Sequence, residues 1–273
     1  MSEHGGKQLI DALDEHWRKY RKLLKACRQS TSEDNIHEFR VSTRRLMSLI
    51  ELLNSLAPQA ALAKIRKALK KQLDQFDELR DTQVMLFEVA KNMPILPELE
   101  PFLAFMHERE QQLLIHSKSN IASFYQPKLR RKVKKAGKRF ERQIANTDLN
   151  TALPIAIDQI YALTLERYQE LDPTNPASIH RLRIAVKKLR YTLLAVQTII
   201  VDLPEPLFKQ LQSYLTHMGD IQNSTVLLNT LDAFFVHKIP EAIEQYYRQQ
   251  QQDLITVFMA RASEILEFWQ KKD

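Results

Sequence analysis

The chain has 273 residues, 44% of them hydrophobic, and is therefore long enough to bury a core of ordinary size. Its 40 Lys and Arg residues outnumber its 33 Asp and Glu residues, and this excess favours polyanionic partners. The single cysteine, Cys27, excludes an internal disulfide, and no Cys and His residues have zinc-finger spacing, so we expect neither a metal site nor a cofactor.

The first residues of the chain mix charges of both signs where a signal peptide requires an apolar run. No stretch approaches the roughly 20 apolar residues that a membrane-spanning helix needs. We therefore expect a cytoplasmic protein with no membrane partner.

The spacing of special residues predicts helices along the whole chain. Four glycines supply too few tight turns for a hairpin-rich sheet protein, and eleven prolines divide the chain into segments of about 20 to 35 residues. Within these segments apolar residues recur at three and four, as at Leu62, Ile65, Leu69, Leu73 and Phe76. We predict an all-α protein of long antiparallel helices, arranged in two bundles that share an axis or a cleft.

An internal repeat supports this organisation. Residues 36–53 read IHEFRVSTRRLMSLIELL, and residues 179–196 read IHRLRIAVKKLRYTLLAV, at an offset of 143 residues. A second pair follows in the same order, LRDTQVML at 79–86 and IQNSTVLL at 221–228. We predict a single domain over residues 1–273, with halves 1–148 and 149–273 that meet in a loop around residues 146–154.

Each copy of the repeat places cations on one helix face. At about 100° per residue, a sector of roughly 60° in the first copy holds His37, Arg40 and Arg44. A sector of about 80° in the second copy holds His180, Arg183, Lys187 and Arg190. Aligned Arg and Lys side chains suit a linear chain of anionic groups. A solvated face paired with nearby acids such as Glu33 and Glu51 is the alternative, and the repetition at matched positions favours binding.

A further basic segment lies at residues 128–142, KLRRKVKKAGKRFER. We interpret its charges as surrounding the helix, with Gly137 as a point where the helix ends or bends. A solvated, charged helix explains the segment as well as a binding role does. Its candidates for secondary binding are Arg131, Lys138 and Arg139.

The Arg80–Asp81 pair is interpreted as an internal ion pair at a helix junction. The corresponding residues of the second copy, Gln222 and Asn223, are uncharged. Arg80 is nevertheless kept as a fourth secondary binding candidate.

The two repeated segments resemble the signatures of the CHAD domain, the conserved histidine α-helical domain, in which His-x-x-Arg precedes a basic pair and Leu. The later segments resemble the Leu-Arg-Asp and Gly-Asp elements of that family. The resemblance implies two pseudo-symmetric four-helix bundles and a central basic channel that binds inorganic polyphosphate. It also implies an association with polyphosphate granules. The binding residues that it implies are His37, Arg40, Arg44, Arg45, His180, Arg183, Lys187, Lys188 and Arg190. The first copy departs from the second at Met47, which occupies the position that Arg190 holds in the second copy.

Three functions are weighed on these residues. The leading hypothesis is non-catalytic binding of inorganic polyphosphate. The second is non-specific binding of a nucleic-acid backbone, although no known nucleic-acid motif is present. The third is a phosphotransfer or phosphohydrolase enzyme using His37 or His180, which lacks the carboxylate cluster or Gly-rich loop that such chemistry requires. We therefore predict no catalytic residue, and nothing in the sequence identifies a protein partner.

Overall fold

The computed structural model describes residues 2–124, 126–197 and 203–269. Within these ranges the chain forms helices and no β-strand, which confirms the all-α prediction. No helix in the described ranges has both the length and the apolar character needed to cross a bilayer.

The helices follow one another with short connections. Those before residue 148 are α1 (Ser2–Gln29), α2 (Glu33–Leu56), α3 (Ala60–Asp74), α4 (Asp77–Asn92), α5 (Glu100–Ser123) and α6 (Gln126–Ile144). Those after it are α7 (Leu149–Gln169), α8 (Pro176–Val196), α9 (Glu205–Phe234) and α10 (Glu241–Arg261). Two short 3₁₀ segments, η1 (Pro97–Leu99) and η2 (Ala262–Glu267), precede α5 and follow α10.

Buried side chains form two hydrophobic cores. The larger core joins α1, α2, α3 and α6 to α7, α8, the beginning of α9 and the end of α10. The smaller core lies at the other end of the elongated molecule, where α4 and α5 meet the end of α9 and the beginning of α10. Both cores therefore draw side chains from both sides of residue 148. The division into halves stays a prediction from the repeat.

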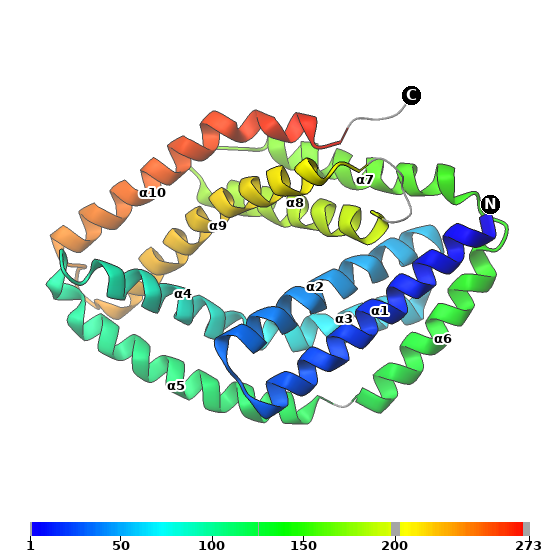
Figure 1. Ribbon diagram of the computed structural model, residues 1–273. Coiled ribbons are helices and arrows are strands. Elements are labelled where there is room, and N and C mark those ends of the chain that lie inside the picture. Colours follow the sequence, from blue (N-terminus) through cyan, green and yellow to red (C-terminus); the bar gives the residue numbers. More distant parts are fainter. Residues whose placement is uncertain (1, 125, 198–202, 270–273) are drawn as a thin grey trace.

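The middle of the molecule is where the two repeated segments meet. The first segment lies on α2 and the second on α8, and these helices pack against each other. Each also packs against the helix beside it in its own part of the chain, α2 on α1 and α3, and α8 on α7 and α9. The arrangement in Figure 1 thus brings two segments 143 residues apart in sequence to one place.

The basic segment at 128–142 differs from our interpretation. It lies within α6, and one face of this helix is apolar and buried at Leu129, Val133, Ala136, Phe140 and Ile144. The cations occupy the opposite, exposed side, so the interpretation that they surround the helix was wrong. Gly137 does not end α6, which continues to Ile144; the glycine is buried inside the helix, facing Leu13 of α1.

The predicted boundary loop is shorter in the structure than in the sequence interpretation. Helix α6 ends at Ile144 and α7 begins at Leu149, where Asp148 caps it by accepting a hydrogen bond from the Asn150 amide. Pro154 lies inside α7 as its sixth residue, where it has no amide to donate to the Asn150 carbonyl.

Candidate functional site

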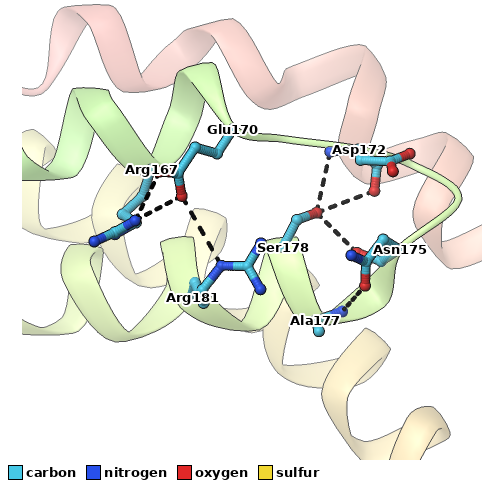
Figure 2. A network of polar contacts seen from close by, with 7 residues as sticks. All are labelled: Arg167, Glu170, Asp172, Asn175, Ala177, Ser178 and Arg181. Carbon is cyan, nitrogen blue, oxygen red and sulfur yellow. Dashed lines mark hydrogen bonds and ion pairs between the residues drawn. The ribbon is translucent and has the colours of Figure 1, made fainter.

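The start of α8 is held by a network of polar contacts in the turn that follows α7 (Figure 2). Asn175 caps the helix by accepting a hydrogen bond of 3.2 Å from the Ala177 amide, and Pro176 occupies the first turn. The Ser178 hydroxyl receives a hydrogen bond from the Asp172 amide and donates to main-chain oxygen. The turn thus fixes where α8 begins and how its basic face is directed.

The start of α2 is capped in a simpler way. Ser32 accepts a hydrogen bond of 3.4 Å from the Asn35 amide, and Glu33 and Asp34 lie in the first turn, where the helix dipole favours negative charge. Apolar residues of α2 and α8 then face the larger core, which leaves the basic faces of both helices toward the helix α4 and each other.

Arg40 is the most deeply placed cation of the first repeat. Its residue is 5% exposed, and its Nη1 lies 2.8 Å from Oδ1 of Asp77, at the start of α4. Burial, and then the charge of Arg44, lower the pKa of Arg40, while Asp77 opposes this. The guanidinium is therefore held by an internal ion pair. Arg44 shares the same carboxylate more weakly, with Nη2 at 3.8 Å from Oδ1.

Lys187 of α8 lies among cations of both helices. Burial is the largest cause that lowers its pKa to about 7, and the charges of Arg183, Arg44 and Arg40 lower it further, whereas Asp77 raises it. An ammonium group loses its proton this readily only where positive charge is crowded and water is scarce. The structure therefore brings four predicted residues together, and we call Arg40, Arg44, Arg183 and Lys187 the central cluster.

The second repeat carries polar atoms that the protein leaves without a partner. Nε of Arg183, Nδ1 of His180 and Nε of Arg190 are each buried and make no hydrogen bond within the described residues. Nε of Arg45, on α2, has the same status. Buried donors without acceptors are uncommon, because each costs free energy, and they mark places where a bound anion would supply the acceptor.

The two histidines of the repeat occupy different surroundings. His180 is half-buried, and burial followed by the charge of Arg183 lowers its pKa, while Gln222 raises it. A polyanion bound nearby would reverse part of that effect by favouring the imidazolium form. His37, the counterpart on α2, is exposed at the edge of the site.

Arg45 and Arg190 form a second pair of cations farther along the two helices. Burial is the main cause that lowers the pKa of Arg190, and Arg45 lowers it too. Arg45 also contributes to the lowered pKa of His16 on α1, after burial. The Arg190 guanidinium lies 5.7 Å from the ring centre of Tyr191, a cation–π contact. His16 and Tyr191 are thus neighbours of the site that the repeat itself does not reveal.

Lys188 is not brought into the cluster. Its Nζ lies 3.6 Å from Oε2 of Glu51, and the same carboxylate bonds Arg66 of α3. Residues 187 and 188 are adjacent on a helix, so their side chains point about 100° apart, and only Lys187 faces the central cluster.

The secondary candidates also lie elsewhere. Arg80 pairs with Glu33 of α2 and not with Asp81, so the predicted internal ion pair was wrong, because neighbouring residues on a helix point in different directions. Arg131, Lys138 and Arg139 lie on the exposed side of α6, which packs against α1 and α3.

Carboxylates from other helices complete the site. Asp77 pairs with Arg40, as described, and Asp81 lies one turn farther along α4, where burial raises its pKa although Arg40 lowers it. Asp220 of α9 lies near Arg183 and its pKa is also raised by burial. These acids were not predicted as partners, because their contacts join helices far apart in sequence. In the described part of the chain no three His, Cys, Asp or Glu residues gather in a way that would hold a metal ion.

The fold resembles that of a solved structure, the crystal structure of the CHAD domain from the plant Ricinus communis. The two chains share 19% identity, and the match covers 96% of this chain and 89% of the other with a TM-score of 0.67. At this identity the likeness concerns the fold alone.

The family is shown by a second comparison. The family model of the CHAD domain matches residues 11–232, which include both repeated segments and most of the helices that form the site. The chain therefore belongs to the CHAD domain family. A comparison with curated proteins finds no match.

Proposed function

We propose that the protein binds inorganic polyphosphate and catalyses no reaction. The polymer lies on the central cluster and continues along α2 and α8 to Arg45 and Arg190. The observation that carries this proposal is that α2 and α8 pack together with buried nitrogens on Arg45, Arg183 and Arg190 that have no partner among the described residues. The charges of Arg183, Arg44 and Arg40 also lower the pKa of Lys187. Such crowding of like charges is unfavourable in the free protein, and an anion relieves it.

The distribution of the cations favours a linear anion over a single phosphate group. From Arg183 to Arg190 the helix rises by about 10 Å, and partnerless buried nitrogens are found at both ends of this interval. A chain of phosphate groups provides an acceptor at each point along such a path. Arginine guanidinium groups bind phosphate oxygens in pairs, and lysine adds a compact charge.

Membership of the CHAD domain family supports the same ligand, since the resemblance of the repeated segments implies polyphosphate binding. In the same proposal the protein associates with polyphosphate granules and needs neither cofactor nor metal. The internal carboxylate Asp77 competes with the ligand for Arg40 and Arg44, so part of the binding free energy replaces an existing ion pair.

The test is calorimetric titration with long-chain polyphosphate of the wild type and of a central-cluster variant, Arg44→Gln, Arg183→Gln and Lys187→Gln. Arg40 is left unchanged because its ion pair with Asp77 is buried and structural. A control variant removes three positive charges elsewhere, by Lys91→Gln, Lys118→Gln and Lys238→Gln, all of them exposed. Circular dichroism establishes that both variants are folded.

We expect the central-cluster variant to lose at least about two powers of ten in affinity, because three phosphate contacts and their counterion release are removed. The control variant is expected to lose much less. Equal losses in both variants would show that net charge, and not the cluster, determines binding. The nucleic-acid alternative would be favoured if the wild type bound single-stranded RNA as tightly as polyphosphate and the central-cluster variant lost this RNA binding.

A further inference from the structure

Helix α6 has two opposite faces of very different composition. Its apolar residues, described above, are buried against the neighbouring helices α1 and α3. The exposed side carries six cations, which together line a groove of about 410 Å³: Arg131, Lys134, Lys135, Lys138, Arg139 and Arg142. We call these six residues the α6 stripe.

The α6 stripe has no internal counter-charge. None of its six cations takes part in an ion pair or a side-chain hydrogen bond among the described residues, whereas Arg40 and Arg44 share Asp77. Between residues 128 and 142 the helix contains one acid, Glu141. Uncompensated cations along about 16 Å of helix produce a local field that attracts polyanions and is screened by salt.

We propose that the α6 stripe is a docking surface for the phosphate backbone of double-stranded nucleic acid, separate from the central cluster. The six cations of the stripe are all exposed along the helix, so they can contact the outside of a wide ligand. In Figure 1 α6 forms the right-hand edge of the molecule, beside α1, at the end away from α4 and the beginning of α10.

The width of the stripe favours a duplex over a single thread. By the helical angle of about 100° per residue, the six cations spread over about 140° of the helix circumference. A single polyphosphate chain would reach those near the centre line, such as Arg131 and Arg142, and leave Lys134 and Arg139 at the sides. A duplex presents phosphates of two strands and reaches both sides.

The other side chains of α6 argue against different ligands. Single-stranded nucleic acid is bound by stacking its bases on aromatic rings, and the one aromatic residue of the stripe's helix, Phe140, is fully buried. A membrane-bound amphipathic helix inserts its apolar face into lipid, but here that face is covered by α1 and α3. Contacts to phosphate alone remain, and they predict binding without sequence preference.

The test measures fluorescence anisotropy of a labelled DNA duplex of mixed sequence over a series of salt concentrations. The full-length protein is compared with a stripe variant, Lys134→Gln, Lys135→Gln and Lys138→Gln, and with the control variant of Lys91, Lys118 and Lys238. Both variants lose three lysines, so they have the same net charge. The changed lysines of the stripe are exposed and away from the buried face, which keeps the helix packed.

We expect wild type and control to bind the duplex with similar salt dependence. Each phosphate contact removed lowers the slope of log affinity against log salt by about 0.9, so the stripe variant should lose about two to three units of slope. The central-cluster variant is expected to keep duplex binding, which separates this proposal from the polyphosphate proposal. Either proposal can therefore fail without the other.

Three results would overturn the proposal. The first is equal duplex binding by the stripe and control variants. The second is polyphosphate binding that survives in the central-cluster variant and disappears only when the stripe lysines are also changed, because the stripe would then be a polyphosphate site. The third is a wild type that does not bind the duplex at all but binds phosphatidylserine vesicles, with the stripe variant losing the vesicle binding.

Discussion

The basic faces of α2 and α8 carry the same kinds of residue at matched positions, yet the protein treats them differently. On α2, Arg40 is 5% exposed and its guanidinium is bonded to Asp77 at 2.8 Å. On α8, the equivalent Arg183 forms no ion pair within 4.0 Å among the described residues, and its buried Nε has no hydrogen-bond partner. The α2 face shares one internal carboxylate between Arg40 and Arg44, and Arg183 of the α8 face has no such partner among the described residues.

The acids opposite the two arginines show the same contrast. Asp77 of α4 lies opposite Arg40, and Asp220 of α9 lies near Arg183. Asp77 bonds its arginine directly, whereas Asp220 influences Arg183 only through its charge. Matched residues in a repeat therefore need not have matched roles, and Arg40 is as much part of the architecture as of the binding site.

The largest expected effect comes from removing the two acids in turn. Asp77→Ala leaves the buried Arg40 guanidinium without its carboxylate, and we expect the free energy of unfolding to fall by about 2 kcal/mol. Asp220→Ala removes an acid that forms no ion pair among the described residues, and it should change the free energy of unfolding by less than about 0.5 kcal/mol. Urea denaturation followed by circular dichroism measures both.

Polyphosphate affinity should change in the opposite sense. Asp77→Ala frees Arg40 and Arg44 from an internal competitor, so the variant is expected to bind at least as tightly as the wild type at a temperature where both are folded. A variant that is fully stable, or one that binds more weakly, would show that Arg40 is not held by Asp77 in the way the structure describes.

The helices and the basic faces were predictable from the sequence, because both follow from local periodicity. The burial of Leu62, Ile65 and Leu69 confirms the reading of α3, and the same rule applied to the apolar residues of α6 would have shown that its cations lie on one side. The sequence interpretation counted the charges there and overlooked Val133 and Phe140, which mark the buried face.

The partners of the cations could not be predicted in the same way. The bond from Arg40 to Asp77 joins α2 to α4, and the contact of Lys188 with Glu51 joins α8 to α2. Such pairs depend on how helices cross, which a single helical period does not determine. The helical period itself placed Lys187, and not Lys188, on the basic face of α8. Lys188 was a candidate only through the family resemblance, and in the structure it contacts Glu51.

We expect pH to have an intermediate effect on polyphosphate affinity. The reason is that Lys187 of α8 stands at the position that Arg44 holds on α2. The free protein holds the pKa of Lys187 at about 7, so this group is protonated below pH 7 and neutral above it. Polyphosphate favours the protonated form, and binding above pH 7 therefore takes up a proton. We expect the affinity to be level below pH 7 and to fall by up to about tenfold per pH unit above it.

The matched variant is Lys187→Arg, which keeps a positive charge throughout this range. Calorimetry at several pH values should give a smaller decline for this variant than for the wild type. Since both titrations use the same ligand, protonation of the polyphosphate itself affects them equally. Identical pH profiles would mean that Lys187 does not titrate at the site.

The smallest expected effect concerns Gly219 of α9, which lies beside Arg183. A Cβ atom at this position would lie 3.0 Å from Nη2 of Arg183, so Gly219→Ala forces the guanidinium to shift by a few tenths of an ångström. The substitution also replaces a glycine inside a helix, which should stabilise the protein by up to about 1 kcal/mol. We expect a slightly higher melting temperature together with polyphosphate affinity that is lower by a small factor.

Gly137→Ala provides the comparison, because this glycine also lies inside a helix but its Cβ would make an ordinary contact, 3.5 Å from Cδ2 of Leu13. It should give a similar rise in melting temperature and leave polyphosphate affinity unchanged. If Gly219→Ala also left the affinity unchanged, then the position of the Arg183 guanidinium would not limit binding. The free charge of the α8 face would then act from a distance and not by direct contact with the ligand.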